Sequence, residues 1–96
     1  MDIRGRKITI IGMGRTALAL ARLLTREGAE PFVTELQGEA ALGEAPAALD
    51  RLGAAWECGG HSEHALTGAA LVVPSPGVPL LSPLLQKARA SGIPVM

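Results

Sequence analysis

The sequence has few of the residues on which several classes of protein depend. Its one cysteine, Cys58, cannot form a disulfide within the chain, so this is no disulfide-stapled scaffold. Nine basic residues balance nine acidic ones, and a net charge of zero gives no general attraction to nucleic acid. Phe and Trp occur once each and Tyr is absent, which argues against an aromatic platform for single-stranded nucleic acid.

Long hydrophobic runs are also missing. A membrane-spanning helix needs roughly 20 apolar residues, and the N-terminal MDIRGRK leads into a strand without the features of a signal peptide. We therefore expect a cytoplasmic protein with no membrane and no nucleic-acid partner. We expect its 96 residues to form a single domain, residues 1–96, with a core of Ala, Leu, Val and Ile.

A glycine-rich turn near the N-terminus is the most informative feature. An apolar strand expected at Lys7 to Ile11 is followed by Gly-Met-Gly-Arg-Thr-Ala at Gly12 to Ala17 and then by an Ala/Leu helix. In such a G-x-G-x-x-A turn the first glycine permits the bend, the second lets a diphosphate approach, and the small third residue packs on the strand. The helix that begins near Arg15 directs unpaired N–H groups at a ligand over Gly14. The pattern favours an anionic, nucleotide-like ligand over a purely structural turn.

Strands and helices alternate along the rest of the chain. Gly28 ends the first helix, and Leu36 to Ala45 is expected to be a loop. Further strands are expected at Pro31 to Thr34, Ala54 to Glu57, Ala70 to Val73 and Ile93 to Met96. A helix is expected from Pro46 to Gly53, a helical turn from Ser62 to about Thr67, and a last helix that Ser82 caps, Pro83 begins and Gly92 stops. Right-handed crossovers then give an α/β, Rossmann-like five-stranded parallel sheet of order 3-2-1-4-5 with helices on both faces.

This strand order brings several loops to one edge of the sheet. The first and fourth strands become neighbours, and a crevice opens at their carboxyl ends. The Gly12 to Ala17 turn and the Ser75-Pro76-Gly77 loop are predicted to form its two walls, with Gly59-Gly60 on the same rim. Glu35 lies 23 residues beyond Gly12, close to the position of an acid that binds a ribose hydroxyl.

Several residues near this edge allow two interpretations. Thr16 could donate its hydroxyl to a phosphate or serve as a surface threonine of the first helical turn. Arg15 could pair with a phosphate, but it shares a helix face with Arg22 and Arg26, which favours exposure to solvent. Glu35 could bind a ribose or base, or remain a hydrated carboxylate at a strand end.

Other reactive side chains do not form a recognised pattern. Cys58, His61 and His64 give C-x-x-H-x-x-H with Glu63 among them, which matches no common zinc spacing. We therefore expect no metal site and interpret Cys58 as a core residue and Trp56 as a core or edge anchor. Ser75 has no paired His and Asp, so no catalytic residue is predicted in this chain.

The motifs taken together resemble a known family. They are IGMGRTALALARLL from Ile11, the acid Glu35, GGH at Gly59 to His61, LVVPSPGVP at Leu71 to Pro79, and the final SGIPV. In this combination the chain is similar, over nearly all its length, to the N-terminal domain of a Mur ligase. The SPG loop at this distance from a G-x-G-x-T turn is the most specific part. The type that it most resembles adds D-glutamate to UDP-N-acetylmuramoyl-L-alanine in peptidoglycan biosynthesis.

The resemblance implies that this domain holds the UDP end of that substrate. The residues implied are Gly14, Arg15 and Thr16 at the diphosphate, Glu35, Leu36 and Gln37 at the uracil, and Ser75, Pro76 and Gly77 completing the site. The chain departs from similar members in carrying Glu rather than Asp at position 35 and Arg rather than a hydrophobic residue at position 15. Leu36 and Gln37 replace polar and basic residues seen in some members.

The resemblance also implies that catalysis takes place elsewhere. Mur ligases activate a carboxylate with ATP to an acyl phosphate, using later domains, and this chain has no G-x-x-x-x-G-K-[ST]. We expect a non-catalytic fragment of an ATP-dependent amide-forming ligase, with the remaining domains as partners. No cofactor is expected in this chain, whereas ATP and Mg are expected for the full-length enzyme. Two alternatives stay open: the NAD-binding half of an oxidoreductase, and a nucleotide-sensing module without chemistry.

Overall fold

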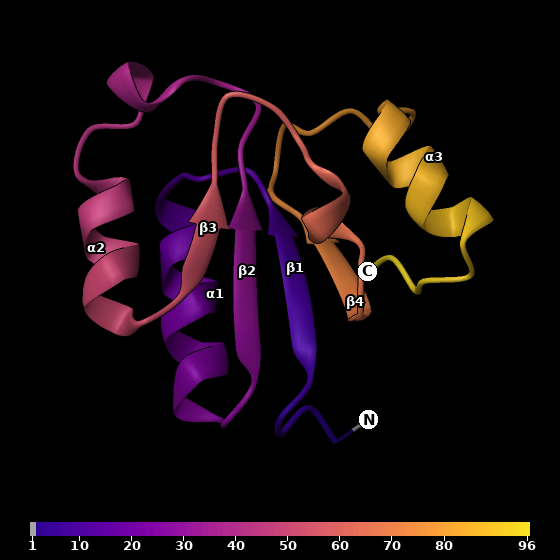
Figure 1. Ribbon diagram of the computed structural model, residues 1–96, viewed down its shortest axis with the longest axis horizontal. Helices are drawn as coiled ribbons and strands as arrows, with labels where there is room; N and C mark the ends of the chain where they lie inside the picture. Colours follow the sequence, from indigo (N-terminus) through magenta and orange to yellow (C-terminus); the bar gives the residue numbers. More distant parts are fainter. Residues whose placement is uncertain (1) are drawn as a thin grey trace.

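The computed structural model describes residues 2–96, which form a parallel sheet with helices on both faces (Figure 1). The strand order is β3-β2-β1-β4, and every pairing is parallel. In chain order the elements are β1 (Lys7–Ile11), α1 (Arg15–Arg26), β2 (Glu30–Thr34), the 3-10 turn η1 (Glu39–Ala41), α2 (Ala45–Leu52), β3 (Ala55–Glu57), the 3-10 turn η2 (Glu63–Ala65), β4 (Ala69–Pro74) and α3 (Pro83–Ala90). The alternation and the order of the first four predicted strands are confirmed.

The predicted fifth strand at Ile93 to Met96 is wrong, and within residues 2–96 the sheet has four strands. A single parallel bridge joins Val95 to Val72. The Val72 N–H donates to the Pro94 carbonyl at 2.9 Å, and the Met96 N–H donates to the Val72 carbonyl at 3.0 Å. Pro94 has no N–H to donate, so these few residues follow the outer edge of β4 without forming a ladder.

The predicted helix caps are confirmed at two elements. Ser82 Oγ accepts from the Leu85 N–H at 3.5 Å at the start of α3, and Pro83 is the first helical residue. Ser62 Oγ accepts from the His64 N–H at 3.1 Å at the start of η2. The stretch expected to be a loop contains the turn η1.

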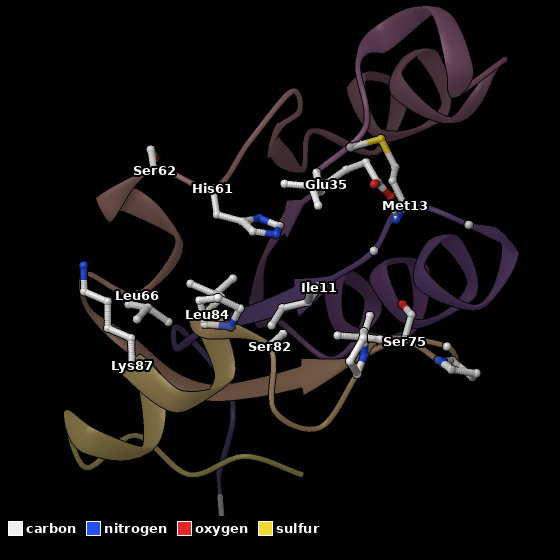
Figure 2. A pocket seen from close by; sticks show the side chains of 18 of the residues that line it. Ile11, Met13, Glu35, His61, Ser62, Leu66, Ser75, Ser82, Leu84 and Lys87 are labelled. Carbon is white, nitrogen blue, oxygen red and sulfur yellow. Dashed lines mark hydrogen bonds between the residues drawn. The ribbon is translucent and has the colours of Figure 1, made fainter.

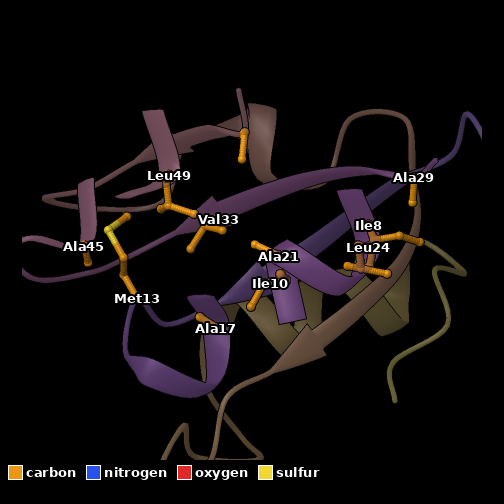
Figure 3. Close-up of a cluster of buried hydrophobic side chains, with 11 residues drawn as sticks. Ile8, Ile10, Met13, Ala17, Ala21, Leu24, Ala29, Val33, Ala45 and Leu49 are labelled. Carbon is orange, nitrogen blue, oxygen red and sulfur yellow. The ribbon is translucent and has the colours of Figure 1, made fainter. Parts of the chain in front are cut away.

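The helices α1 and α2 cover one face of the sheet (Figures 1 and 3). Ile8, Ile10 and Val33 point from β1 and β2 into this layer and are almost fully buried. Alanines at the sheet-facing positions of α1 let the helix approach closely, as predicted for Ala17. The buried members of this cluster, the first core, are Ile8, Ile10, Met13, Ala17, Ala21, Leu24, Ala29, Val33, Ala45, Leu49 and Ala54.

The opposite face is covered by α3 and η2 and has a smaller apolar cluster. Ile11 and Val72 pack there with Leu85 and Ala88 of α3, and these four form the second core. This face also carries the hydroxyl groups of Thr9 and Thr34, and both residues are fully buried. The Thr9 hydroxyl donates to the Ala65 carbonyl at 2.6 Å, which holds η2 over the sheet. This face therefore combines apolar packing with buried polar groups.

Trp56 and Cys58, at the β3 edge of the sheet, differ in how they pack. Trp56 packs against the first core, and its Nε1 donates to Asp50 Oδ1 of α2 at 2.8 Å, so its role as an edge anchor is confirmed. Cys58 is half-buried and belongs to neither core, so its interpretation as a core residue is wrong. It follows β3 where the chain leaves the sheet toward Gly59-Gly60. No helix within residues 2–96 has the length and apolarity needed to cross a membrane.

Candidate functional site

A cavity of about 1150 Å³ opens over the carboxyl ends of β1 and β4. The glycine turn, the Ser75 to Gly77 loop, η2 and α3 surround it (Figure 2). The convergence predicted from the strand order is therefore confirmed. Of the residues predicted for the site, the cavity is lined by Gly14, Arg15, Thr16, Glu35, Leu36, Ser75, Pro76 and Gly77, whereas Gln37 is not part of the lining.

Gly12 is required by the fold. Its φ of +101° lies in the region that favours glycine. A Cβ built on Gly12 would lie 3.0 Å from both Cβ and Oγ of Ser75, a distance that real Cβ atoms seldom tolerate. The Gly12 N–H donates to the Thr34 carbonyl at 2.9 Å, and the Ser75 N–H donates to the Ile11 carbonyl at 2.8 Å. Gly12 thus lets the two walls of the cavity touch at its base.

Gly14 is not required by the fold in the same way. Its φ of −113° and ψ of −165° are extended values that any residue adopts, and a Cβ there would meet no atom within 4 Å. Gly14 caps α1 without offering a side-chain acceptor. The first helical hydrogen bond is made by the Leu18 N–H to the Gly14 carbonyl, at 3.0 Å. The amides of Arg15, Thr16 and Ala17 therefore have no acceptor within the helix and are free to bind an anion.

The turn is held in place from both sides through Met13. The Met13 side chain is buried in the first core (Figure 3), and its N–H donates to Glu35 Oε1 at 2.9 Å. The other oxygen of this carboxylate accepts from the Gln37 N–H at 2.9 Å. Glu35 therefore joins the glycine turn to the loop after β2. Each carboxylate oxygen has a further lone pair, so a ligand contact at Glu35 stays a prediction.

Gln37 lies outside the cavity because its backbone is tied to the β3 end. Its carbonyl accepts from the Gly59 N–H at 2.7 Å, and the Gly60 N–H donates to the Glu35 carbonyl at 3.3 Å. These bonds join the segments after β2 and β3 along the rim, which places Gly59-Gly60 where the strand order predicted. Leu36, between Glu35 and Gln37, is 68% exposed and lines the cavity mouth.

Ser75 has an unusual hydroxyl. Its Oγ is sealed from solvent and is the one such side-chain atom within residues 2–96 that has no hydrogen-bond partner. The side chain is held against Gly12 by the contact of the two walls. An unpaired buried hydroxyl costs about 1–3 kcal/mol of stability. This loss of stability occurs where the Ser75 to Gly77 loop contacts the glycine turn.

Several residues of the cavity were not predicted from the sequence as site residues. They come from the segment after β3 and from α3, and they include His61, Ser62, Leu66, Leu84 and Lys87 (Figure 2). In the sequence, His61 stands out only as part of the C-x-x-H-x-x-H motif and of the GGH resemblance. Its place on the rim next to Gly59-Gly60 was the available signal. Lys87 gave no signal, because only the packing of α3 brings it to the cavity.

A hydrogen-bond network holds His61 in the cavity. Thr34 Oγ1 lies 2.6 Å from Glu57 Oε2 and 2.7 Å from His61 Nδ1. Glu57 also accepts from the Ser62 N–H at 2.9 Å and from the Ser62 hydroxyl. Burial raises the pKa of Glu57, but the bonds from Ser62 and Thr34 outweigh it and hold this pKa below its usual value.

Lys7 of β1 binds the η2 segment on the face of the sheet that bears the cavity. Its Nζ donates to the carbonyls of His64 and, at 2.8 Å, Thr67, and it lies 4.7 Å from the centre of the Phe32 ring. Burial lowers the pKa of Lys7, and the charge of Glu57 partly opposes that change. Among residues 2–96 there is no group of three or more His, Cys, Asp or Glu side chains placed to hold a metal ion.

These features define a class of domain before any relative is considered. A parallel sheet, a glycine turn after its central strand and a cavity at the carboxyl ends are typical of a Rossmann-like ligand-binding domain. The solved structure of D-lactate dehydrogenase from Escherichia coli matches 99% of this chain over 28% of its own, with a TM-score of 0.70 and 18% identity. SirC, precorrin-2 dehydrogenase, matches 99% of this chain over 45% of its own, with a TM-score of 0.62 and 18% identity. At such identities the likeness shows the fold alone.

The family follows from sequence comparison. Residues 6–96 match the model of the Mur ligase MurD-like N-terminal domain, and the chain belongs to this family. It is 48% identical over 94 residues to UDP-N-acetylmuramoylalanine--D-glutamate ligase of Anaeromyxobacter dehalogenans, covering 98% of this chain. It is 41% identical over 96 residues to the enzyme of the same name from Desulfosudis oleivorans, covering 100% of this chain. The chain spans about a fifth of the length of these relatives, 20% and 21%.

Proposed function

We propose that this chain binds the UDP part of UDP-N-acetylmuramoyl-L-alanine. The supporting observation is the open space at Gly14 in front of the free amides of α1, in a member of the MurD-like N-terminal family. A diphosphate placed there accepts hydrogen bonds from Arg15 and Thr16 amides and lies at the positive end of the helix dipole. Thr16 and Arg15, both exposed, also line the cavity.

The other predicted residues have distinct parts in this proposal. Leu36 offers an exposed apolar surface at the cavity mouth on which a uracil ring can lie, and Glu35 fixes that loop relative to the glycine turn. Gln37 meets the base only with its side chain, since its N–H donates to Glu35 and its carbonyl accepts from the Gly59 N–H. Ser75, Pro76 and Gly77 close the opposite wall.

The parent protein, in this proposal, is an ATP-dependent ligase of the cytoplasm that joins D-glutamate to UDP-N-acetylmuramoyl-L-alanine for peptidoglycan. The names of the relatives support the ligase and the amino acid. ATP and Mg act in the remaining domains, and this chain acts by binding and orienting the nucleotide end of the substrate. It needs no cofactor and no catalytic residue of its own for that task.

The test is a set of NMR shift titrations with UDP-N-acetylmuramoyl-L-alanine, UDP and NAD. We expect amide shifts at Gly14, Thr16 and Gly77 with both UDP compounds and none with NAD. Shifts with NAD alone would favour the NAD-binding half of an oxidoreductase. A response to free UDP without any preference for the full substrate would favour a nucleotide-sensing module.

A variant separates binding from folding. Gly14→Val places a branched side chain in the open space that the diphosphate would occupy, while the extended backbone at Gly14 accommodates it. We expect UDP binding to be lost and the amide spectrum of the core to be retained. Unchanged affinity in this variant would contradict the assignment of the turn to the diphosphate.

A further inference from the structure

We propose that His61 contacts the ligand through Nε2, which Thr34 and Glu57 hold ready as a hydrogen-bond acceptor. The identity of the ligand rests on the proposed function, whereas the hydrogen-bond geometry at His61 does not. His61 lines the cavity, and its ring points toward the space bounded by Ile11 and Leu84 (Figure 2). The ligand group that it takes is an N–H or O–H donor, such as a sugar hydroxyl or an amide.

The positions of the hydrogens follow from the donors and acceptors in the network. Glu57 is ionised at neutral pH, because its pKa lies below the usual value, and its carboxylate can only accept. The single hydroxyl hydrogen of Thr34 therefore points to Glu57 Oε2, at 2.6 Å. The Thr34 oxygen is then left as an acceptor toward His61 Nδ1, at 2.7 Å. His61 must carry its hydrogen on Nδ1.

The hydrogen of the Ser62 hydroxyl can be assigned in the same way. Ser62 Oγ accepts from the His64 N–H at 3.1 Å, which leaves its hydrogen free to donate to Glu57 Oε1. Every hydroxyl or ring hydrogen in this network thus has one acceptor. If the Thr34 hydroxyl pointed to His61 instead, the Thr34 oxygen and Glu57 Oε2 would face each other with no hydrogen between them. The tautomer of His61 is therefore set by Thr34 and, through it, by Glu57.

The free nitrogen of His61 is open to the cavity. Nε2 has no hydrogen-bond partner among residues 2–96 and is not one of the side-chain atoms sealed from solvent. In neutral His61 this nitrogen has a lone pair and no hydrogen. The cavity thereby contains two opposite functions: amides of α1 that donate to an anion, and an imidazole nitrogen that accepts from a donor.

The tautomer can be measured directly by long-range ¹H–¹⁵N correlation of the imidazole rings at pH 8. We expect the pattern of an Nδ1–H ring for His61. His64 is exposed and serves as the internal control, for which we expect the Nε2–H form that predominates in free neutral histidine. Thr34→Val removes the oxygen that fixes the ring and should return His61 to the Nε2–H pattern, whereas Thr34→Ser keeps the oxygen and should retain Nδ1–H. An Nε2–H ring in the unmodified chain overturns the inference, whether or not the variants fold.

The ligand contact is tested by following His61 Nε2 while UDP-N-acetylmuramoyl-L-alanine is added. A shift of Nε2 toward hydrogen-bonded values, together with shifts of the Gly14 and Thr16 amides, supports the inference. We also expect His61→Leu to weaken binding by about 3- to 10-fold, the usual effect of one lost hydrogen bond. Amide shifts with an unchanged Nε2 overturn the inference and leave the proposed function standing. No shift at the amides overturns the proposed function, and the ligand contact with it.

Discussion

The two faces of the sheet differ in what they bury. Within residues 2–96, the face under α1 and α2 has eleven buried apolar residues in one cluster, whereas the face under α3 and η2 has four. The second face instead holds the buried hydroxyls of Thr9 and Thr34, the charged network at Glu57, and the cavity. We infer that the first face supplies most of the stability and the second supplies the chemistry.

The largest effect is expected from emptying the first core. Leu49→Ala removes a fully buried side chain and should lower the free energy of unfolding by about 2–5 kcal/mol. Leu84→Ala, on the half-buried lining of the cavity, should cost about 1 kcal/mol or less, because part of that side chain already faces solvent. Urea unfolding of the two variants measures the difference. Equal losses would contradict the assignment of stability to the first face.

A second comparison is made within the glycine turn. Gly12→Ala should lower the free energy of unfolding by about 2–3 kcal/mol, because the residue would keep a positive φ and press on Ser75 at 3.0 Å. Gly14→Ala should cost about 1 kcal/mol or less, mainly as a poorer helix cap. Thermal unfolding of the pair measures both. A Gly14 variant as unstable as the Gly12 variant would show that the second glycine is structural.

The turn and the strand order could be predicted from the sequence because they depend on local patterns. The apolar run Lys7 to Ile11, the glycines that follow it and the spacing to the SPG loop are each readable within a short window. The close approach of two parallel strands then placed both loops on one cavity. The fifth strand was overpredicted because an apolar tetrapeptide such as Ile93 to Met96 satisfies the same pattern whether or not it pairs.

The rest of the site depends on contacts that no local pattern encodes. Glu35 was expected to face a ligand, and its bond to the Met13 amide could not be seen from a spacing of residues. His61 depends on Thr34, which is 27 residues away in the chain. Lys87 reaches the cavity only because α3 packs on Val72 and Ile11. Polar side chains that bind distant partners are thus the part that requires a structure.

The link that Glu35 makes between the glycine turn and the loop after β2 should show a smaller effect. Glu35→Gln leaves one oxygen for two N–H donors and turns an NH₂ group toward the other, which should cost about 1–2 kcal/mol. Glu39→Gln in the exposed turn η1 is the matched control and should change stability by less than about 0.5 kcal/mol. Hydrogen exchange at the Met13 amide should become faster in the first variant only. Unchanged exchange there would mean that the carboxylate does not hold the turn.

The smallest effect should depend on pH and belong to the second face. The folded state holds the pKa of Glu57 below its usual value of 4.5, so ionised Glu57 contributes stability that is present above pH 4.5 and is lost as pH falls through the lowered pKa. Glu57→Gln should therefore cost about 0.5–1 kcal/mol at pH 7, and the difference from the unmodified chain should shrink below pH 4.5. Glu63→Gln, in the same segment but exposed, is the control for the loss of a carboxylate and should change stability at pH 7 by less than about 0.5 kcal/mol. Urea unfolding of all three chains between pH 3 and pH 7 provides the measurement. A difference that stays constant across this range would mean that Glu57 acts by shape alone and that the hydrogen bonds from Ser62 and Thr34 do not favour its ionised form.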